Sequence, residues 1–140
     1  MYATEQDIID RYGLNDFLVV ADHDQDGVAD AEVVDQALMD ATAEIDTWLA
    51  AKYDLPLATK PSVLVRICAD IAMYRLSDET ALASELRQTR YKEAIRLLKA
   101  IAAGEASLGL PNPPPSANGR AHLVSSAPRR FTRRSMRGLK

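Results

Sequence analysis

The last acidic residue of this chain is Glu105, and the charge of the chain changes sign after it. Residues 1–105 contain ten Lys and Arg against twenty Asp and Glu, whereas residues 106–140 contain seven Lys and Arg and no acidic residue. Five of the seven prolines also lie after Glu105, and a segment of this composition cannot bury a hydrophobic core. A folded domain is therefore expected over 1–105 and an extended segment over 106–140.

Residues 106–140 are predicted to form an extended, Pro-rich, basic C-terminal arm. Opposite electrostatic fields on the domain and the arm would steer the arm toward an acidic partner surface. A solvated terminus without a partner has the same composition, so both interpretations stay open. If the arm does bind a partner, the predicted binding residues are Arg120, Arg129, Arg130, Phe131, Arg133, Arg134, Arg137 and Lys140.

Residues 1–105 are enough for one small domain and no second one. Aromatic residues make up only 6% of the chain and Ala is abundant, which favours an all-α bundle over a sheet sandwich. The single cysteine, Cys68, lies in an apolar run and is expected to be a core residue in a reducing compartment rather than a nucleophile. The polar N-terminus and the lack of a long apolar stretch predict no signal peptide and no membrane span.

Two short helices are expected near the N-terminus. Thr4 and Asp7 have the spacing of a capping box, and Gly13 should end the helix that follows. Residues 15–21 are too few for periodicity to distinguish a helix from a strand, and we interpret them as a second short helix.

Three long helices should make up the rest of the bundle. Apolar residues recur every three or four positions over 30–52, which predicts an amphipathic helix with Trp48 in the core. Residues 61–76 are apolar around most of a helical circumference, so this helix should be the central one. The last helix is predicted over 80–103, with Leu82 and Leu86 among its inward residues and with Gly104 ending it.

An acidic loop, Asp22–Asp30, precedes the first long helix. Its alternating carboxylates are followed directly by Gly27, as in the first half of an EF-hand-like calcium loop. The ninth position of such a loop is Asp30, but Val33 occupies the twelfth, where a bidentate Glu is needed. Calcium affinity should therefore be millimolar or absent, and the predicted metal residues are Asp22, Asp24, Asp26 and Asp30.

The same acidic loop has a simpler interpretation without metal. Asp30 would cap the long helix, and the negative charges would favour the positive N-terminal end of that helix. Both interpretations stay open on the sequence.

No catalytic residues are predicted, and the chain is not expected to be an enzyme. The two histidines, His23 and His122, stand in no recognisable nucleophile motif, and phosphate-binding loops and zinc spacings are absent. The arm arginines suit a phosphate backbone, but Phe131 is the only stacking platform among them. The acidic domain makes free DNA a poor partner.

Six short segments occur in an order and spacing that resemble a family of small proteins from the morphogenesis region of Mu-like phages and prophages. The resemblance covers the chain from Met1 to about Leu110. The segments are Met1–Thr4, Asp7–Tyr12, Asp22–Asp30, Ala43–Leu49, Tyr53–Leu57 and Asp70–Leu76.

That family is similar to phage head-tail connectors, the adaptors that form a ring beneath the portal. The resemblance implies an all-α subunit, a dodecameric ring, an arm that reaches along the portal, and no catalytic residue or cofactor. We therefore expect a structural adaptor at the head-tail interface of the virion, assembled in the bacterial cytoplasm. Its expected partners are its own copies, the portal, a stopper or tail completion protein, and double-stranded DNA that passes through the channel without sequence-specific contacts.

Two alternatives come from other functional classes. The acidic loop would suit a small calcium-binding regulatory protein, and the arm would suit a small nucleic-acid-binding protein.

Overall fold

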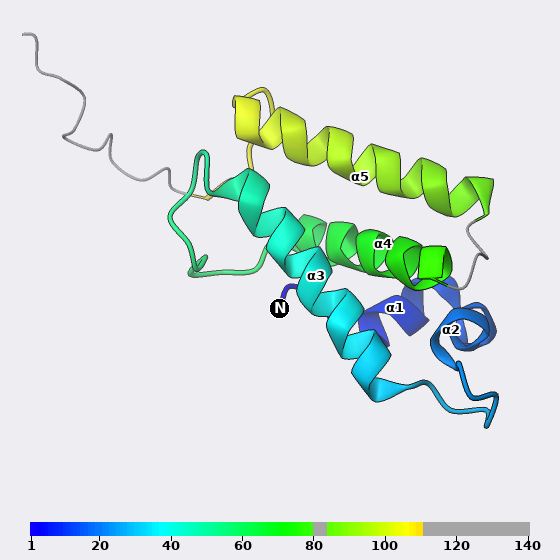
Figure 1. The fold of residues 1–140 in the computed structure, drawn as a ribbon. Helices are drawn as coiled ribbons and strands as arrows, with labels where there is room; N and C mark the ends of the chain where they lie inside the picture. Colours follow the sequence, from blue (N-terminus) through cyan, green and yellow to red (C-terminus); the bar gives the residue numbers. More distant parts are fainter. Residues whose placement is uncertain (80–83, 111–140) are drawn as a thin grey trace, which may run out of the picture.

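The computed structural model describes residues 1–79 and 84–110, which fold into five helices and no strand (Figure 1). This confirms the predicted all-α bundle of three long helices and two short N-terminal ones. Residues 80–83 and 111–140, which include most of the predicted arm, lie outside the described ranges. The helices are α1 (Glu5–Tyr12), α2 (Leu14–Ala21), α3 (Ala31–Leu49), α4 (Ser62–Glu79) and α5 (Glu85–Ala103).

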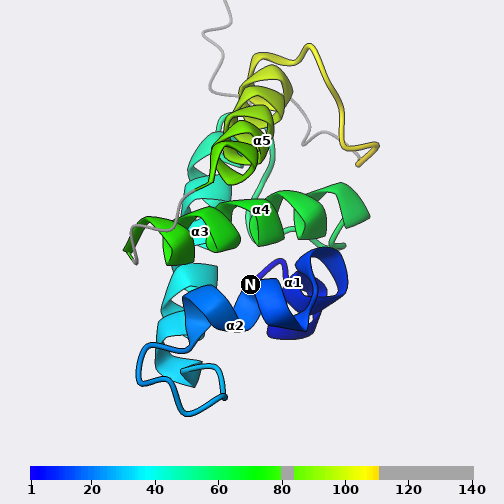
Figure 2. The ribbon, with the colours of Figure 1, turned by 90° about the vertical axis from the view of Figure 1, so that its right-hand side faces the viewer.

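Helix α4 is the centre of the bundle, and it contacts each of the other four helices. Figure 1 shows α5 on one side of α4 and the pair α1 and α2 on the other, and the turned view in Figure 2 shows the same three levels. Helix α3 packs against both α4 and α5. The predicted central position of this helix is confirmed, because side chains around nearly all of α4 are buried: Leu64, Ile67, Cys68, Ile71, Ala72, Met73 and Leu76.

The two short helices begin and end where local chemistry sets their limits. The Thr4 hydroxyl accepts a hydrogen bond from the Asp7 N–H, and the Asp7 carboxylate accepts one from the Thr4 N–H at 2.7 Å, so the predicted capping box is present. Gly13 separates α1 from α2 with a φ of 86°, a conformation that other residues rarely adopt. The second short helix is confirmed, and it buries Phe17, Val20 and Ala21.

Helix α4 is longer than the sequence pattern indicated, since it continues past Leu76 to Glu79. Ser77 follows the range 61–76 that the sequence predicted for this helix, and it is fully buried within α4. Its hydroxyl donates to the Met73 carbonyl oxygen at 2.6 Å, which satisfies the polar group inside the helix. Helix α5 begins at Glu85 with Ser84 as its N-cap, and the predicted start at Thr80 lies outside the described residues.

Of two residues that were predicted to face the core, Leu86 does not lie in it, and Trp48 packs against its edge. Leu86 is 59% exposed, because the buried stripe of α5 runs through Ala94, Leu98 and Ile101 and a helical repeat places Leu86 to one side of it. Trp48 is half-buried at the edge of the α3 stripe, where the Lys99 ammonium lies 5.6 Å from its ring. The predicted end of α5 is confirmed, since Gly104 adopts the left-handed conformation with a φ of 82°.

Candidate functional site

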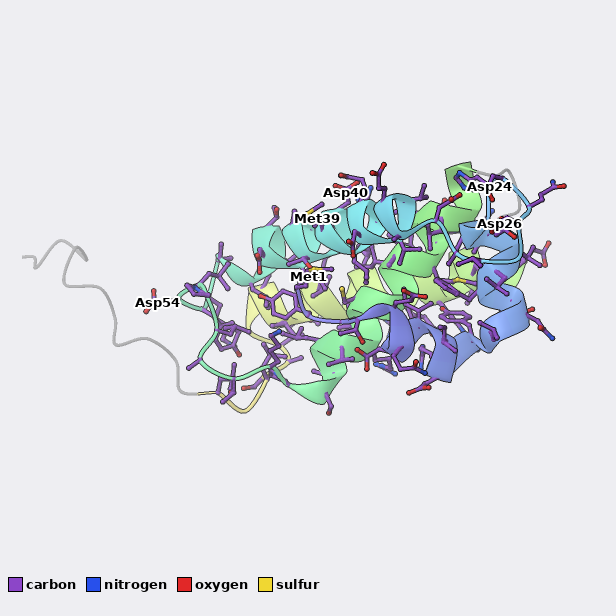
Figure 3. All side chains as sticks on the ribbon, turned by 90° about the horizontal axis from the view of Figure 1, so that it is seen from below. Met1, Asp24, Asp26, Met39, Asp40 and Asp54 are labelled. Atoms are coloured by element: carbon purple, nitrogen blue, oxygen red, sulfur yellow. The ribbon has the colours of Figure 1, made fainter. Side chains whose placement is uncertain are left out.

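The acidic loop joins α2 to α3 and brings three of its four predicted metal ligands together. One carboxylate oxygen from each of Asp22, Asp24 and Asp26 lies within 4.8 Å of the other two. Asp24 and Asp26 are exposed and Asp22 is half-buried, and Figure 3 labels the two exposed ones at the end of the molecule where the loop lies. The spacing therefore predicted that these three carboxylates lie together, but it also included Asp30, which lies outside the cluster.

Backbone N–H groups of the loop donate to these carboxylates. Asp22 accepts from Gly27 at 2.8 Å and from Asp26 at 3.2 Å, and Asp26 accepts from Val28 at 2.8 Å. The glycine is required, because the backbone has a φ of 88° at this point. The loop is thus held in shape by its own side chains.

Asp30 plays a different part from the one that the sequence indicated. It occupies the N-cap position of α3, but its side chain makes no capping hydrogen bond. Instead, its carboxylate accepts from the His23 N–H at 2.9 Å, and its own N–H donates to the Ala21 carbonyl oxygen at 2.8 Å. Asp30 therefore closes the base of the loop, and it is not among the three clustered carboxylates.

The clustered charges affect one another. The Asp26 N–H favours the ionised form of Asp24, but desolvation and the negative charges of Asp26, Asp30 and Asp22 together raise the pKa of Asp24 above its ordinary value. A carboxylate with a raised pKa in a group of carboxylates indicates mutual repulsion, which a cation or a proton would relieve.

The remaining predicted site residues fall into two groups. The arm residues from Arg120 to Lys140 lie outside the described residues. Cys68 is fully buried, its sulfur lies 3.9 Å from the Thr42 hydroxyl oxygen, and burial raises the pKa of the thiol. These features confirm Cys68 as a core residue, because a reactive cysteine needs exposure and a lowered pKa.

Sequence reasoning missed a partly buried ionic network that joins α1, α4 and α5. The Arg11 guanidinium donates to both carboxylate oxygens of Asp70, at 2.6 and 2.9 Å, and the Tyr12 hydroxyl donates to the same carboxylate at 2.7 Å. The Arg90 guanidinium lies 4.9 Å from the centre of the Tyr12 ring. One signal was available: a lone carboxylate in the apolar run Ile67–Met73 needs a partner when that run is buried.

A second network joins α3, α4 and α5. Glu44 accepts from Arg75 at 2.7 Å and from the Tyr91 hydroxyl at 3.0 Å. The rings of Tyr74 and Tyr91 are stacked with their centres 4.4 Å apart. Together the two networks tie four helices to one another through charged and aromatic side chains, which suits a body that keeps its shape under load.

The described helices include none that is long and apolar enough to cross a membrane.

Comparison with known proteins matches this chain to proteins of phage Mu and of a Mu-like prophage. The sequence profile of the family described as "Bacteriophage Mu, Gp36" matches residues 2–125, which extends past Leu110, where the resemblance was expected to end. The chain is 38% identical over 110 residues to the "Mu-like prophage FluMu protein gp36" of Haemophilus influenzae, covering 79% of this chain and 77% of that protein. It is 34% identical over 110 residues to "Gene product J" of Escherichia phage Mu, covering 78% of this chain and 77% of that protein.

Proposed function

This chain belongs to the bacteriophage Mu Gp36 family, and we propose on that basis that it is a structural head-tail connector subunit. Family membership over residues 2–125 is the observation that carries the proposal, because it assigns the chain to a phage and supports a role in morphogenesis. The finer statement, a connector that forms a dodecameric ring and has no enzymatic activity, extends this role from the resemblance of the sequence to connectors.

The architecture supports a mechanical role. A connector has to hold its shape while DNA passes through it, and a small helical body does so when its helices are tied by packing and by partly buried polar networks. Here α4 provides the packing for all the other helices, and the Asp70 and Glu44 networks connect it to α1, α3 and α5.

The charge of the domain supports the proposed channel. Residues 1–105 carry twice as many acidic as basic residues, and an acidic lumen repels the phosphate backbone and allows double-stranded DNA to slide. The proposed partners are further copies of the chain, the portal protein and a stopper or tail completion protein. The proposed location is the head-tail interface of the virion, after assembly in the host cytoplasm.

Binding to portal-containing heads that lack tails tests this function. We expect the purified protein to co-sediment with such heads and not with heads assembled without portal, which serve as the matched control. Equal recovery with both kinds of head would mean non-specific adsorption, and no recovery with either would remove the connector assignment.

A further inference from the structure

The outer face of α3 is acidic and carries one large exposed apolar side chain, Met39. Helix α3 contains five acidic residues and no Lys or Arg. Glu44 and Asp46 are engaged within the fold, by Arg75 and by the Tyr2 hydroxyl. Glu32 and Asp35 are exposed, as is Met39, which is 49% exposed and is labelled on α3 with Asp40 in Figure 3. We call the set Glu32, Asp35, Gln36, Met39, Asp40 and Ala43 the acidic face.

The outer face of α5 carries a stripe of three basic residues. Lys92, Arg96 and Lys99 are spaced by four and three residues, which places them on one stripe of the helix. All three are exposed, and no ion pair among the described residues involves them. A shallow hollow lined by Glu93, Arg96, Leu97 and Ala100 lies beside the stripe. We call Lys92, Arg96, Lys99 and this hollow the basic face.

The two faces point in different directions on one subunit. Helices α3 and α5 pack against each other and against α4, and Figure 1 shows α3 crossing one side of the bundle while α5 lies along another. Within the basic face, the Lys99 ammonium reaches α3, where it lies 5.6 Å from the centre of the Trp48 ring. No ion pair among the described residues joins the acidic face to the basic face within one copy of the chain.

We propose that the acidic face of one subunit binds the basic face of the next, with Met39 seated in the hollow beside Arg96. Charge complementarity identifies the partner as a second copy, because each copy carries both halves of the contact. Two different patches in contact make a heterologous interface, which generates a ring when its rotation closes. An apolar side chain within a rim of paired charges is the usual plan of a specific interface. The inference rests on the proposed ring and names the surfaces that build it.

Charge reversal of each face provides the test. In the full-length chain, Lys92→Glu with Arg96→Glu makes both faces acidic, and Glu32→Lys with Asp35→Lys makes both basic. We expect wild-type protein to self-associate at low ionic strength, and each reversed variant alone to associate at least about tenfold more weakly because like charges then meet. An equimolar mixture of the two variants should regain association, since each then offers the face that the other lacks.

Light scattering after size exclusion gives the mass of each sample, and matched controls carry the same charge change elsewhere. Lys60→Glu with Arg66→Glu is the control for the α5 variant, and Asp16→Lys with Asp54→Lys is the control for the α3 variant, because all four residues are exposed and lie off both faces. Both controls should associate like wild type. Circular dichroism reports whether each variant folds, and the neutral changes Lys92→Gln with Arg96→Gln replace any variant that does not.

Three results would overturn the inference: monomeric wild type at low ionic strength, reversed variants that associate like their controls, or no recovery on mixing. A fourth result would also overturn it. If changing Arg129, Arg130, Arg133 and Arg134 to Glu in the full-length chain abolishes self-association, the arm and not the basic face binds the acidic face. Loading of wild-type protein on portal-containing heads is scored separately. If wild-type protein loads on heads but charge reversal does not weaken self-association, only this inference is contradicted. If wild-type protein self-associates but does not load on heads, the connector function is contradicted.

Discussion

Arg11 and Asp70 lie 59 residues apart in the chain, yet the guanidinium of the first donates to both carboxylate oxygens of the second. Asp70 is only 6% exposed, and it lies on the central helix. This pair connects α1 to α4, and the Tyr12 hydroxyl completes it. A buried carboxylate that loses a bidentate arginine retains its desolvation cost without the compensating charge.

Arg11→Ala is therefore expected to destabilise the fold by about 2–4 kcal/mol, somewhat below a fully buried pair because the arginine side chain is 31% exposed. Urea unfolding followed by circular dichroism measures the change. Arg66→Ala is the matched control, an exposed arginine that forms no ion pair among the described residues, and it should cost less than about 0.5 kcal/mol. Arg11→Met combined with Asp70→Leu should recover much of the loss, and equal effects of Arg11→Ala and Arg66→Ala would contradict the role of the pair.

The fold should lose stability at alkaline pH. Burial raises the pKa of the Cys68 thiol and of the Tyr12 hydroxyl above their ordinary values, and the Asp70 carboxylate adds to the shift in the pKa of Tyr12. Burial and Glu44 likewise raise the pKa of Tyr91. Folded protein then holds protons that unfolded protein releases, so this stabilisation is fully present below the unfolded pKa values and declines from about pH 9 upward.

Urea midpoints recorded across neutral and alkaline pH measure this decline. Tyr12→Phe lowers stability at neutral pH by removing a hydrogen bond, but it should make the alkaline decline shallower because one shifted group is gone. An alkaline slope that stays the same in this variant would show that Tyr12 ionises equally in both states.

Trp48 and Phe17 should differ in what their removal costs. Phe17 is fully buried, so Phe17→Ala should cost about 3–5 kcal/mol. Trp48 is only half-buried, and Trp48→Ala should cost about 1–2 kcal/mol. Equal losses in thermal unfolding would mean that the tryptophan belongs to the core, as its position on the apolar face of α3 first indicated.

The acidic loop offers a matched pair of aspartates. Asp22→Ala removes the acceptor for the N–H groups of Asp26 and Gly27 and should cost about 1–2 kcal/mol. Asp24→Ala removes one long hydrogen bond together with a charge that its neighbours repel, so the stability of the fold should change little. A larger loss from the Asp24 change would contradict this account of the loop.

Thermal melting curves test whether the acidic loop binds calcium. Millimolar Ca²⁺ should raise the Tm of wild type if the cluster binds it, by mass action, and Asp24→Ala should abolish the rise. Unchanged curves would leave the loop as a hydrogen-bonded turn.

Local sequence patterns predicted the helices because the interactions that begin, end and bury a helix involve residues close together in the sequence. The Thr4 capping box, the left-handed Gly104 and the apolar circumference of α4 depend on residues within a few positions of one another. The limits of α4 were missed because a polar Ser77 looks like a break, and only the structure shows its hydroxyl bonded to its own helix. Periodicity also cannot measure how wide a buried stripe is, which is why it did not show that Trp48 is only half-buried against the core.

Some of the candidate sites could likewise be predicted from the sequence, and others could not. Spacing alone brought Asp22, Asp24 and Asp26 together, because a loop of consecutive residues sets its own geometry. The partners of Asp70 and Glu44 lie on other helices, and no periodicity states which helices meet. The acidic and basic faces also needed the arrangement of α3 and α5, since the sequence gives the charges of each helix but not the side that faces solvent.

The basic arm is expected to strengthen attachment to the portal. Changing Arg129, Arg130, Arg133 and Arg134 to Glu should weaken co-sedimentation with portal-containing heads, and the difference from wild type should shrink at high ionic strength if the contacts are exposed. Helical circular dichroism should be unchanged, because the domain before Glu105 contains the described helices. Full loading of this variant would make the arm a passive terminus.

The copy number of this protein in purified phage particles tests the central claim most directly. Quantitative mass spectrometry of mature virions compares it with the portal protein and with the major capsid protein. A connector ring predicts a fixed ratio close to one copy per portal subunit, retained after the particles are washed at high ionic strength. Absence from the particles, or a ratio to portal that varies between preparations, would contradict the assignment of this chain to the head-tail interface.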